Sequence, residues 1–275
     1  MKYKHVLGIS GGKDSAALAI FMRDNYPELD IEYFFTDTGK ELPEVYEYLS
    51  KLEGYLGKTI LRINPDRDFD FWLMQHNNYL PSAQARWCTI KMKLKPFEDW
   101  VKTFLLEGYE VFSYVAIRSD EEYREGYQSK NKNLHIKLPF REHGVDKQNV
   151  LEILEQTGLG LPEYYKWRSR SGCTFCFFQR KIEWVGLLEN HPEAFEEAKA
   201  YEKTAVKNGT PFTWSERESL EELAQPVRIR QIKEDHQRRV ERLESNQIAN
   251  ALRPNENLDI DELYGNTKSC LICHK

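Results

Sequence analysis

The segment that most constrains this chain is SGGKDS at residues 10–15, which stands between two opposite patterns. Residues 5–9 are typical of a buried strand, and residues 13–25 are typical of a helix. Glycines in such a loop let the backbone approach a phosphate, and the free N–H groups at the start of a helix bind oxyanions. The two serines add hydroxyl donors and Lys13 adds charge. The segment therefore predicts a phosphate-binding loop; the alternative is a tight turn capped by serines.

Two common phosphate loops are excluded by spacing. A Walker A loop needs four residues between its glycines and a Ser or Thr after its lysine. Here only three residues separate Gly8 from Gly12, and Asp14 follows Lys13. The G-x-G-x-x-G fingerprint of dinucleotide-binding folds is also absent.

Strand and helix patterns alternate through the first half of the chain. Strands are predicted at residues 5–9, 31–36, 59–63, 111–117 and 135–138, and helices at 13–25, 42–54, 69–76 and 89–106. This alternation favours an α/β fold: a Rossmann-like, mostly parallel five-stranded sheet with helices on both faces. We place a nucleotide-binding domain at residues 1–140.

Strand signals stop after about residue 140, and a helical, cysteine-containing region is predicted at residues 141–275. Its expected helices are 145–156, 182–188, 193–207 and 227–245, and residues 246–275 look like an extended or weakly ordered tail. The mixed charge of 227–245 favours a solvated helix over an arm that binds nucleic acid. The net charge of −5 leaves DNA binding to a local basic patch. Without a membrane span or signal-peptide core, a cytoplasmic location is expected.

The chain has five cysteines, an odd number that argues against a full disulfide framework. Cys88 stands alone, whereas Cys173 and Cys176 form one C-x-x-C pair and Cys270 and Cys273 another. In a cytosolic chain such pairs indicate metal or redox chemistry.

SGGKDS resembles the PP-loop of the adenine-nucleotide α-hydrolase superfamily, which includes ATP pyrophosphatases and PAPS reductases. Further segments resemble this family in the same order along roughly residues 3–204. They are the DTG and PE elements of residues 37–44, RWCT at 86–89 before Lys95-Pro96, IRSDE at 117–121 before Arg124, LPF at 138–140, GCTFC at 172–176 and HPE at 191–193. The first cysteine of the family's Cys-Cys pair is Trp87 here.

The C-terminal E-C-G-[LI]-H motif of sulfonucleotide reductases is absent. Sulfonucleotide reduction is therefore the weaker interpretation. The combination of RWCT and Lys95-Pro96 with GCTFC looks more like the DNA-phosphorothioation ATP pyrophosphatases (Dnd- and Ssp-type) and related phage and defence-island proteins. That resemblance implies that ATP adenylates an acceptor with release of pyrophosphate, so that sulfur can then be inserted. A DNA backbone phosphate is the best candidate for this acceptor. It also implies a cysteine desulfurase as sulfur donor. A PAPS or APS reductase and a non-catalytic nucleotide-sensing subunit of a defence complex remain as alternatives.

The resemblance assigns ATP and Mg²⁺ as ligands and gives catalytic roles to Lys13, Asp14, Asp37 and Arg118. The loop would hold the β- and γ-phosphates, Asp14, Asp37 and Glu41 are candidates for Mg²⁺ or ribose, and the arginines would contact the α-phosphate or the acceptor. Each arginine could instead form a surface ion pair. The nucleotide-binding set is Ser10, Gly11, Gly12, Lys13, Asp14, Ser15, Thr36, Asp37, Gly39, Glu41, Arg86 and Arg124.

In iron–sulfur members of the family, the segments that hold Cys88, Cys173 and Cys176 ligate a [4Fe–4S] cluster. The resemblance supplies these three ligands, and Cys273 (or Cys270) would complete the set if the tail folds back. A zinc site is the first alternative. The second is that no metal binds and that Cys173 and Cys176 handle persulfides.

Overall fold

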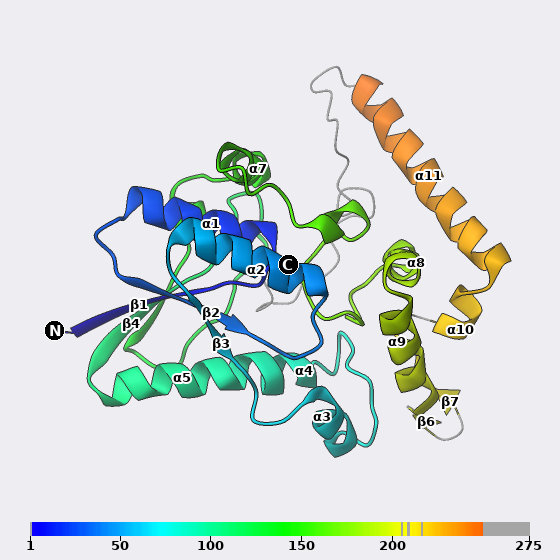
Figure 1. Cartoon of the computed structure of the whole chain (residues 1–275), viewed down its shortest axis with the longest axis horizontal. Helices are drawn as coiled ribbons and strands as arrows, with labels where there is room; N and C mark the ends of the chain where they lie inside the picture. Colours follow the sequence, from blue (N-terminus) through cyan, green and yellow to red (C-terminus); the bar gives the residue numbers. More distant parts are fainter. Residues whose placement is uncertain (1, 205, 208–209, 216, 250–275) are drawn as a thin grey trace.

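A parallel five-stranded sheet stands at the centre of the computed structural model, which describes residues 2–249 except 205, 208–209 and 216 (Figure 1). The strand order is β3-β2-β1-β4-β5, and all four neighbouring pairs are parallel. The strands are β1 (Lys2–Gly8), β2 (Ile31–Thr36), β3 (Ile60–Ile63), β4 (Tyr109–Tyr114) and β5 (Leu134–Lys137). The predicted fold class is confirmed. The strand order reverses between β1 and β4, which is where open α/β sheets bind ligands.

Helices cover both faces of the sheet, as the sequence predicts (Figure 1). Helices α1 (Lys13–Asn25), α2 (Pro43–Leu56) and α7 (Lys147–Gln156) lie on one face, and α5 (Lys95–Leu106) lies on the other. Neighbouring strand residues alternate between these layers: Leu7 belongs to the core under α1 and α2, and Val6 belongs to the core under α5. This alternation follows from the two-residue period of a β-strand.

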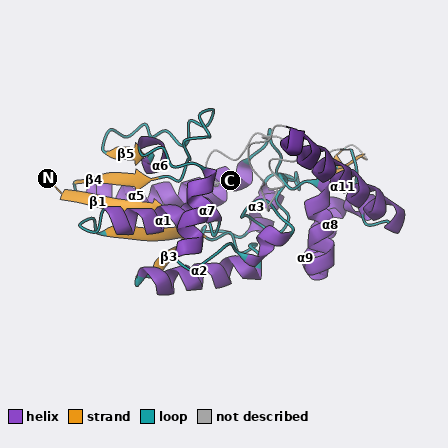
Figure 2. Cartoon of the chain, turned by 90° about the horizontal axis from the view of Figure 1, so that it is seen from above, coloured by secondary structure: helices purple, strands orange, loops and turns teal. Residues whose placement is uncertain are grey.

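From α8 onward the chain is mainly helical and lies beyond the carboxyl ends of the strands (Figures 1 and 2). Helix α8 packs against α9 and α11. The elements not yet placed are α3 (Phe69–Gln75), α4 (Trp87–Thr89), η1 (Ile90–Leu94), α6 (Pro139–Glu142), η2 (Glu163–Lys166), α8 (Lys181–Asn190), α9 (Pro192–Thr204), β6 (Val206–Lys207), β7 (Thr210–Pro211), α10 (Leu220–Leu223) and α11 (Pro226–Ala249).

The single helix predicted at residues 89–106 is wrong in one respect, because α4, the π-helix η1 and α5 follow one another there. Pro96 has no N–H to donate to the carbonyl of Met92, and its ring would crowd that carbonyl. The chain adapts by widening the turn, and the N–H of Lys95 bonds the carbonyl of Ile90, five residues back.

Other boundaries also differ from the predicted ones. Strand β4 ends at Tyr114 rather than at residue 117, since the N–H of Ile117 turns back to the carbonyl of Val115. The prediction that strands stop after about residue 140 missed the short antiparallel pair β6–β7. Helix α11 continues through residue 249, and residues 250–275 of the predicted tail lie outside the described residues.

The two halves of the chain share one core. Tyr164, Trp184 and Phe195 belong to the same buried cluster as Leu7 and Leu18. The boundary at residue 140 stays a prediction.

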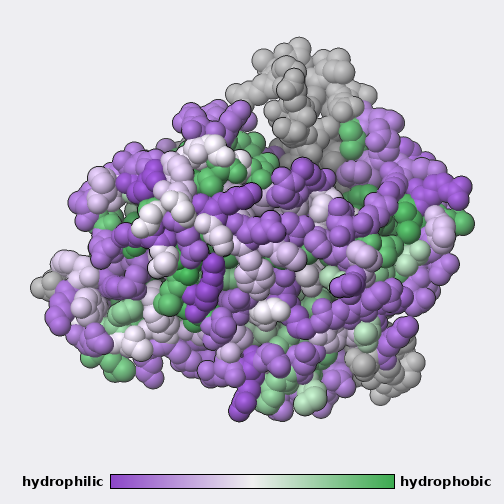
Figure 3. All heavy atoms as spheres, in the orientation of Figure 1, coloured by the Kyte–Doolittle hydropathy of each residue, from purple (hydrophilic) through white to green (hydrophobic). Residues whose placement is uncertain are grey.

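Within the part that the structure describes, no helix is long and apolar enough to cross a membrane. The face in Figure 3 is mostly hydrophilic, with scattered apolar groups.

Candidate functional site

The predicted phosphate loop connects β1 to α1 at the carboxyl edge of the sheet. Gly11 has a φ of +73°, and a Cβ atom there would lie 2.6 Å from Cγ1 of Val45. A Cβ at Gly12 would lie 2.9 Å from Oγ of Ser171. Both glycines are thus required by backbone shape or by space.

The loop serines bind the loop itself. Oγ of Ser15 accepts from the N–H of Ser10 at 3.0 Å and lies 3.2 Å from the carbonyl oxygen of Gly12. The hydroxyls of Ser10 and Ser15 are 3.1 Å apart. Lys13 is 1% exposed. The two serines therefore stabilise the shape of the loop, and the first N–H groups of α1 are directed toward this loop.

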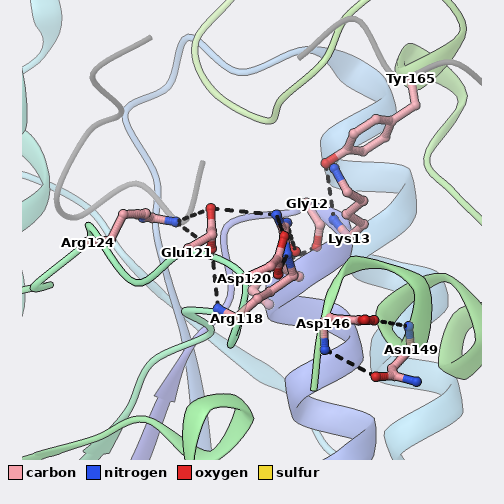
Figure 4. Close-up of polar contacts among 11 residues, drawn as sticks. Gly12, Lys13, Arg118, Asp120, Glu121, Arg124, Asp146, Asn149 and Tyr165 are labelled. Atoms are coloured by element: carbon pink, nitrogen blue, oxygen red, sulfur yellow. Dashed lines mark hydrogen bonds and ion pairs between the residues drawn. The ribbon is translucent and has the colours of Figure 1, made fainter. Parts of the chain in front are cut away.

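Three side chains from the second half of the chain contact this loop, and the sequence analysis missed them. The hydroxyl of Tyr164 donates to the carbonyl of Gly11 at 2.7 Å, and Ser171 Oγ donates to Ser10 Oγ at 3.2 Å. The Tyr165 hydroxyl accepts from the N–H of Lys13 at 3.3 Å, and Lys13 Nζ lies 4.7 Å from the centre of the same ring (Figure 4). Tyr165 thus covers a donor that a phosphate oxygen would use.

A partly open pocket lies beside the loop at the switch point of the sheet. The carboxyl ends of β1, β2 and β4 form one side of it, and η1 and α5 form another. Its lining combines apolar rings with polar groups, which is the composition typical of small-molecule sites. The lining residues include Gly8, Ser10, Phe34, Thr36, Lys93, Phe97, Ser113 and Tyr114.

The segment after β2 brings two predicted carboxylates to the same edge. Asp37 Oδ1 accepts from the N–H of Gly39 and from the hydroxyl of Tyr46, both at 2.8 Å. Glu41, 6% exposed, accepts from Thr38 Oγ1 at 3.1 Å and lies 3.5 Å from Lys93 Nζ. Both contacts of Asp37 use one oxygen, so Oδ2 has no donor among the described residues. Mg²⁺ on a nucleotide needs only one or two carboxylates, and Asp37 fits that requirement.

Asp14 and Arg118 meet across 104 positions of sequence. Arg118 Nη1 donates to Asp14 Oδ1 at 2.8 Å, and both side chains are under 5% exposed. Arg118 also donates to Asp120, and Arg124 Nη1 donates to both oxygens of Glu121. Burial opposes the charge of Arg118, but the carboxylates, Asp14 first, raise its pKa above the usual value. These arginines form buried ion pairs, whereas the alternative from the sequence was a surface ion pair. Their predicted contacts with the α-phosphate or the acceptor stay predictions.

Cys173 is tied to the segment after β2. Its Sγ lies 3.2 Å from Thr38 Oγ1 and 3.7 Å from Glu41 Oε1, and the N–H of Thr174 donates to the carbonyl of Lys40 at 2.7 Å. Burial, and then the nearby carboxylate of Glu41, raise the pKa of the Cys173 thiol above its usual range. The thiol is therefore protonated and faces a carboxylate.

The described residues contain no group of three or more His, Cys, Asp or Glu side chains placed to hold a metal ion. Cys88, Cys173 and Cys176 are therefore not gathered into a shared site, and Cys270 and Cys273 lie outside the described residues. The cysteines described do not fit a four-thiolate centre, so no chemical step is assigned to a cluster. The predicted ligand set stays a prediction.

Residues 4–138, just under half of the chain, match the phosphoadenosine phosphosulfate reductase domain. The matched segment contains the phosphate loop, the residues that line the pocket and most of the sheet, whereas Tyr165 and Ser171 lie beyond it.

Two curated relatives of this chain are uncharacterized. One, from Methanocaldococcus jannaschii, is 25% identical over 68% of this chain, and the match spans only 44% of the relative. The other, a 37.8 kDa protein of Escherichia phage 186, is 25% identical over 72% of this chain and 74% of its own length.

Among solved structures, a PAPS reductase from Candida auris in a phosphate complex aligns with a TM-score of 0.49 and 13% identity, over 62% of this chain and 81% of its own. The U34-tRNA thiolase NcsA from Methanococcus maripaludis, with its [4Fe-4S] cluster, aligns with a TM-score of 0.39 and 15% identity, over 73% and 71%.

Proposed function

We propose that this chain is an ATP pyrophosphatase that cleaves ATP between the α- and β-phosphates and passes the adenylyl group to an acceptor. The observation that carries this proposal is the buried Lys13 in a glycine-shaped loop, placed next to a pocket at the switch point of the sheet. A nucleotide whose base occupies the pocket directs its phosphates toward the loop.

Different residues of the chain then have different roles in this reaction. The N–H groups at the start of α1 and the ammonium of Lys13 stabilise the negative charge that develops on the leaving pyrophosphate. Asp37 would hold Mg²⁺, which neutralises phosphate oxygens when it is bound. Arg118 fixes Asp14, the second residue of α1, and thereby holds the start of the helix that carries the loop donors.

The acceptor follows from the family resemblance. A DNA backbone phosphate remains our best candidate, with sulfur insertion after adenylation and a cysteine desulfurase as sulfur donor. Reduction of a sulfonucleotide is the second candidate, because the matching domain is named for that activity. The combination of RWCT at residues 86–89 with GCTFC at residues 172–176 favours the first candidate, because it resembles the ATP pyrophosphatases.

The test is product analysis of the full chain with ATP and Mg²⁺. Release of AMP and pyrophosphate is expected; ADP and phosphate would contradict the proposal. Lys13→Met keeps the buried stem but removes the charge, and we expect it to lose about tenfold or more in rate. Lys102→Met, an exposed residue of α5, is the matched control. Sulfite released from PAPS with a dithiol reductant would favour the second candidate.

A further inference from the structure

Two neighbouring tyrosines of η2 reach the phosphate loop with contacts of different strength. Tyr164 is 0% exposed, and its hydroxyl donates to the carbonyl of Gly11 at 2.7 Å. Tyr165 is half-buried, and its hydroxyl accepts from the N–H of Lys13 at 3.3 Å, which is long for a hydrogen bond of this kind. The two rings are stacked, with their centres 4.8 Å apart. Tyr164 is therefore the fixed contact, and Tyr165 is the contact that a ligand can replace.

The Tyr165 hydroxyl also occupies space that the loop leaves open at Gly12. A Cβ atom at Gly12 would lie 3.3 Å from this oxygen and 2.9 Å from Ser171 Oγ. Glycines in a phosphate-binding loop let a phosphate come close to the backbone. Figure 4 shows the Tyr165 side chain pointing toward Lys13. Tyr165 therefore lies in the path of a phosphate that approaches the N–H of Lys13.

The ring of Tyr165 covers the charge of the loop as well. Lys13 Nζ lies 4.7 Å from the centre of the ring, and Lys13 is 1% exposed. A cation–π contact of this kind stabilises a buried ammonium. A phosphate group binds the same ammonium and the same N–H by charge-assisted hydrogen bonds, which are roughly twice as strong as those between neutral groups. A phosphate can thus displace Tyr165, whereas a ligand without phosphate gains nothing by doing so.

We propose that Tyr165 is a gate over the phosphate loop, which a polyphosphate chain opens by replacing both contacts of Tyr165 with Lys13. The contact is autoinhibitory, because displacement of Tyr165 lowers the apparent affinity of every ligand that binds the loop through phosphate. The proposal rests on the proposed function, since it takes the loop to be the site of the ATP phosphates. Tyr165 lies beyond residues 4–138, so the second half of the chain supplies the gate. By linkage, any contact that holds Tyr165 in place lowers the affinity for ATP.

The test uses a ligand that reaches the loop alone. The full chain is titrated by calorimetry with inorganic tripolyphosphate and Mg²⁺, and in a parallel titration with adenosine. Tyr165→Leu keeps apolar bulk against the Tyr164 ring but removes the hydroxyl and the aromatic face. This variant should bind tripolyphosphate about tenfold or more tightly than the wild type, because both competing contacts are lost. Its binding of adenosine, which carries no phosphate, should not change.

Neighbouring and distant tyrosines provide the matched controls. Tyr164→Phe removes the hydroxyl that holds the Gly11 carbonyl, so it should weaken tripolyphosphate binding, an effect of opposite sign to that of its neighbour. Tyr3→Phe changes a 52% exposed residue near the amino end of β1, at the far end of the strand from the loop, and should leave the affinity unchanged. When Lys13→Met is also present, Tyr165→Leu should give a smaller gain, because the ring then covers no ammonium.

A folded Tyr165→Leu variant that binds tripolyphosphate no more tightly than the wild type would overturn the gate. An equal gain for adenosine, or tripolyphosphate that binds neither protein, would also overturn it. Tyr165→Phe removes the hydroxyl alone and serves if Tyr165→Leu does not fold, with an expected gain of about 2- to 10-fold. The proposed function fails on a separate measurement: ADP rather than AMP formed from ATP would reject that function, and the tripolyphosphate titrations would still decide whether the gate exists.

Discussion

Replacing Arg118 with methionine tests whether the Asp14–Arg118 pair supports the phosphate loop. The pair is 2.8 Å long, and its side chains are 3% and 4% exposed. Removing one partner of a buried ion pair leaves the other charge uncompensated, which typically costs about 3–5 kcal/mol. For a chain of this size that corresponds to a fall in Tm of roughly 5–20 °C.

The same network offers a graded control. Asp120 also accepts from Arg118, but its side chain is 40% exposed. Solvent screens that contact, so Asp120→Asn should cost no more than about 1 kcal/mol. Asp14→Asn should fall between the two, because Arg118 keeps Asp120 as a partner and asparagine still offers an oxygen to it.

The assay is thermal and urea unfolding of all three variants, followed by circular dichroism. The expected order of destabilisation is Arg118→Met, then Asp14→Asn, then Asp120→Asn. An Arg118→Met variant that melts within about 2 °C of Asp120→Asn would refute the reasoning, since it would mean that burial adds nothing to this contact.

Three further predictions concern the same edge of the sheet. Tyr165→Phe keeps the ring but removes the hydroxyl that accepts from the N–H of Lys13. The affinity for the α,β-methylene analogue of ATP, measured by calorimetry, should therefore rise about 2- to 10-fold. A fall in affinity would mean that the hydroxyl binds the nucleotide. Gly11→Ala should lower the free energy of unfolding by about 2–4 kcal/mol, because the φ of Gly11 is positive and Val45 occupies the space that a Cβ atom needs. Adding Val45→Ala to this variant should recover part of the lost stability in urea unfolding. No recovery would rule out the clash with Val45. The raised pKa keeps the Cys173 thiol protonated. Iodoacetamide should therefore label Cys173 at pH 8 at least about tenfold more slowly in the folded than in the unfolded protein, as measured by peptide mass spectrometry. Equal labelling rates would contradict the raised pKa.

The sequence by itself determined the parts of this protein that depend on short-range patterns. The alternation of strands and helices follows from local periodicity and predicted the parallel sheet with helices on both faces. The loop between β1 and α1 was equally predictable, because Gly11, Gly12 and Lys13 act through local backbone shape and the start of a helix within six residues. Proline chemistry at Pro96 explains the π-helix, but the sequence did not indicate whether the chain would break, kink or widen there.

Only the tertiary structure decided which groups meet at the carboxyl edge of the sheet. Tyr165 reaches Lys13 across 152 positions, and Arg118 reaches Asp14 across 104. No local signal distinguishes these side chains from solvated ones. Their partners depend on how the loops beyond the strands pack, and that packing reflects the sum of many distant contacts rather than the propensity of any one segment. The same packing set Arg86 and Arg170 beside the ring of Phe178 and placed Cys173 against Glu41.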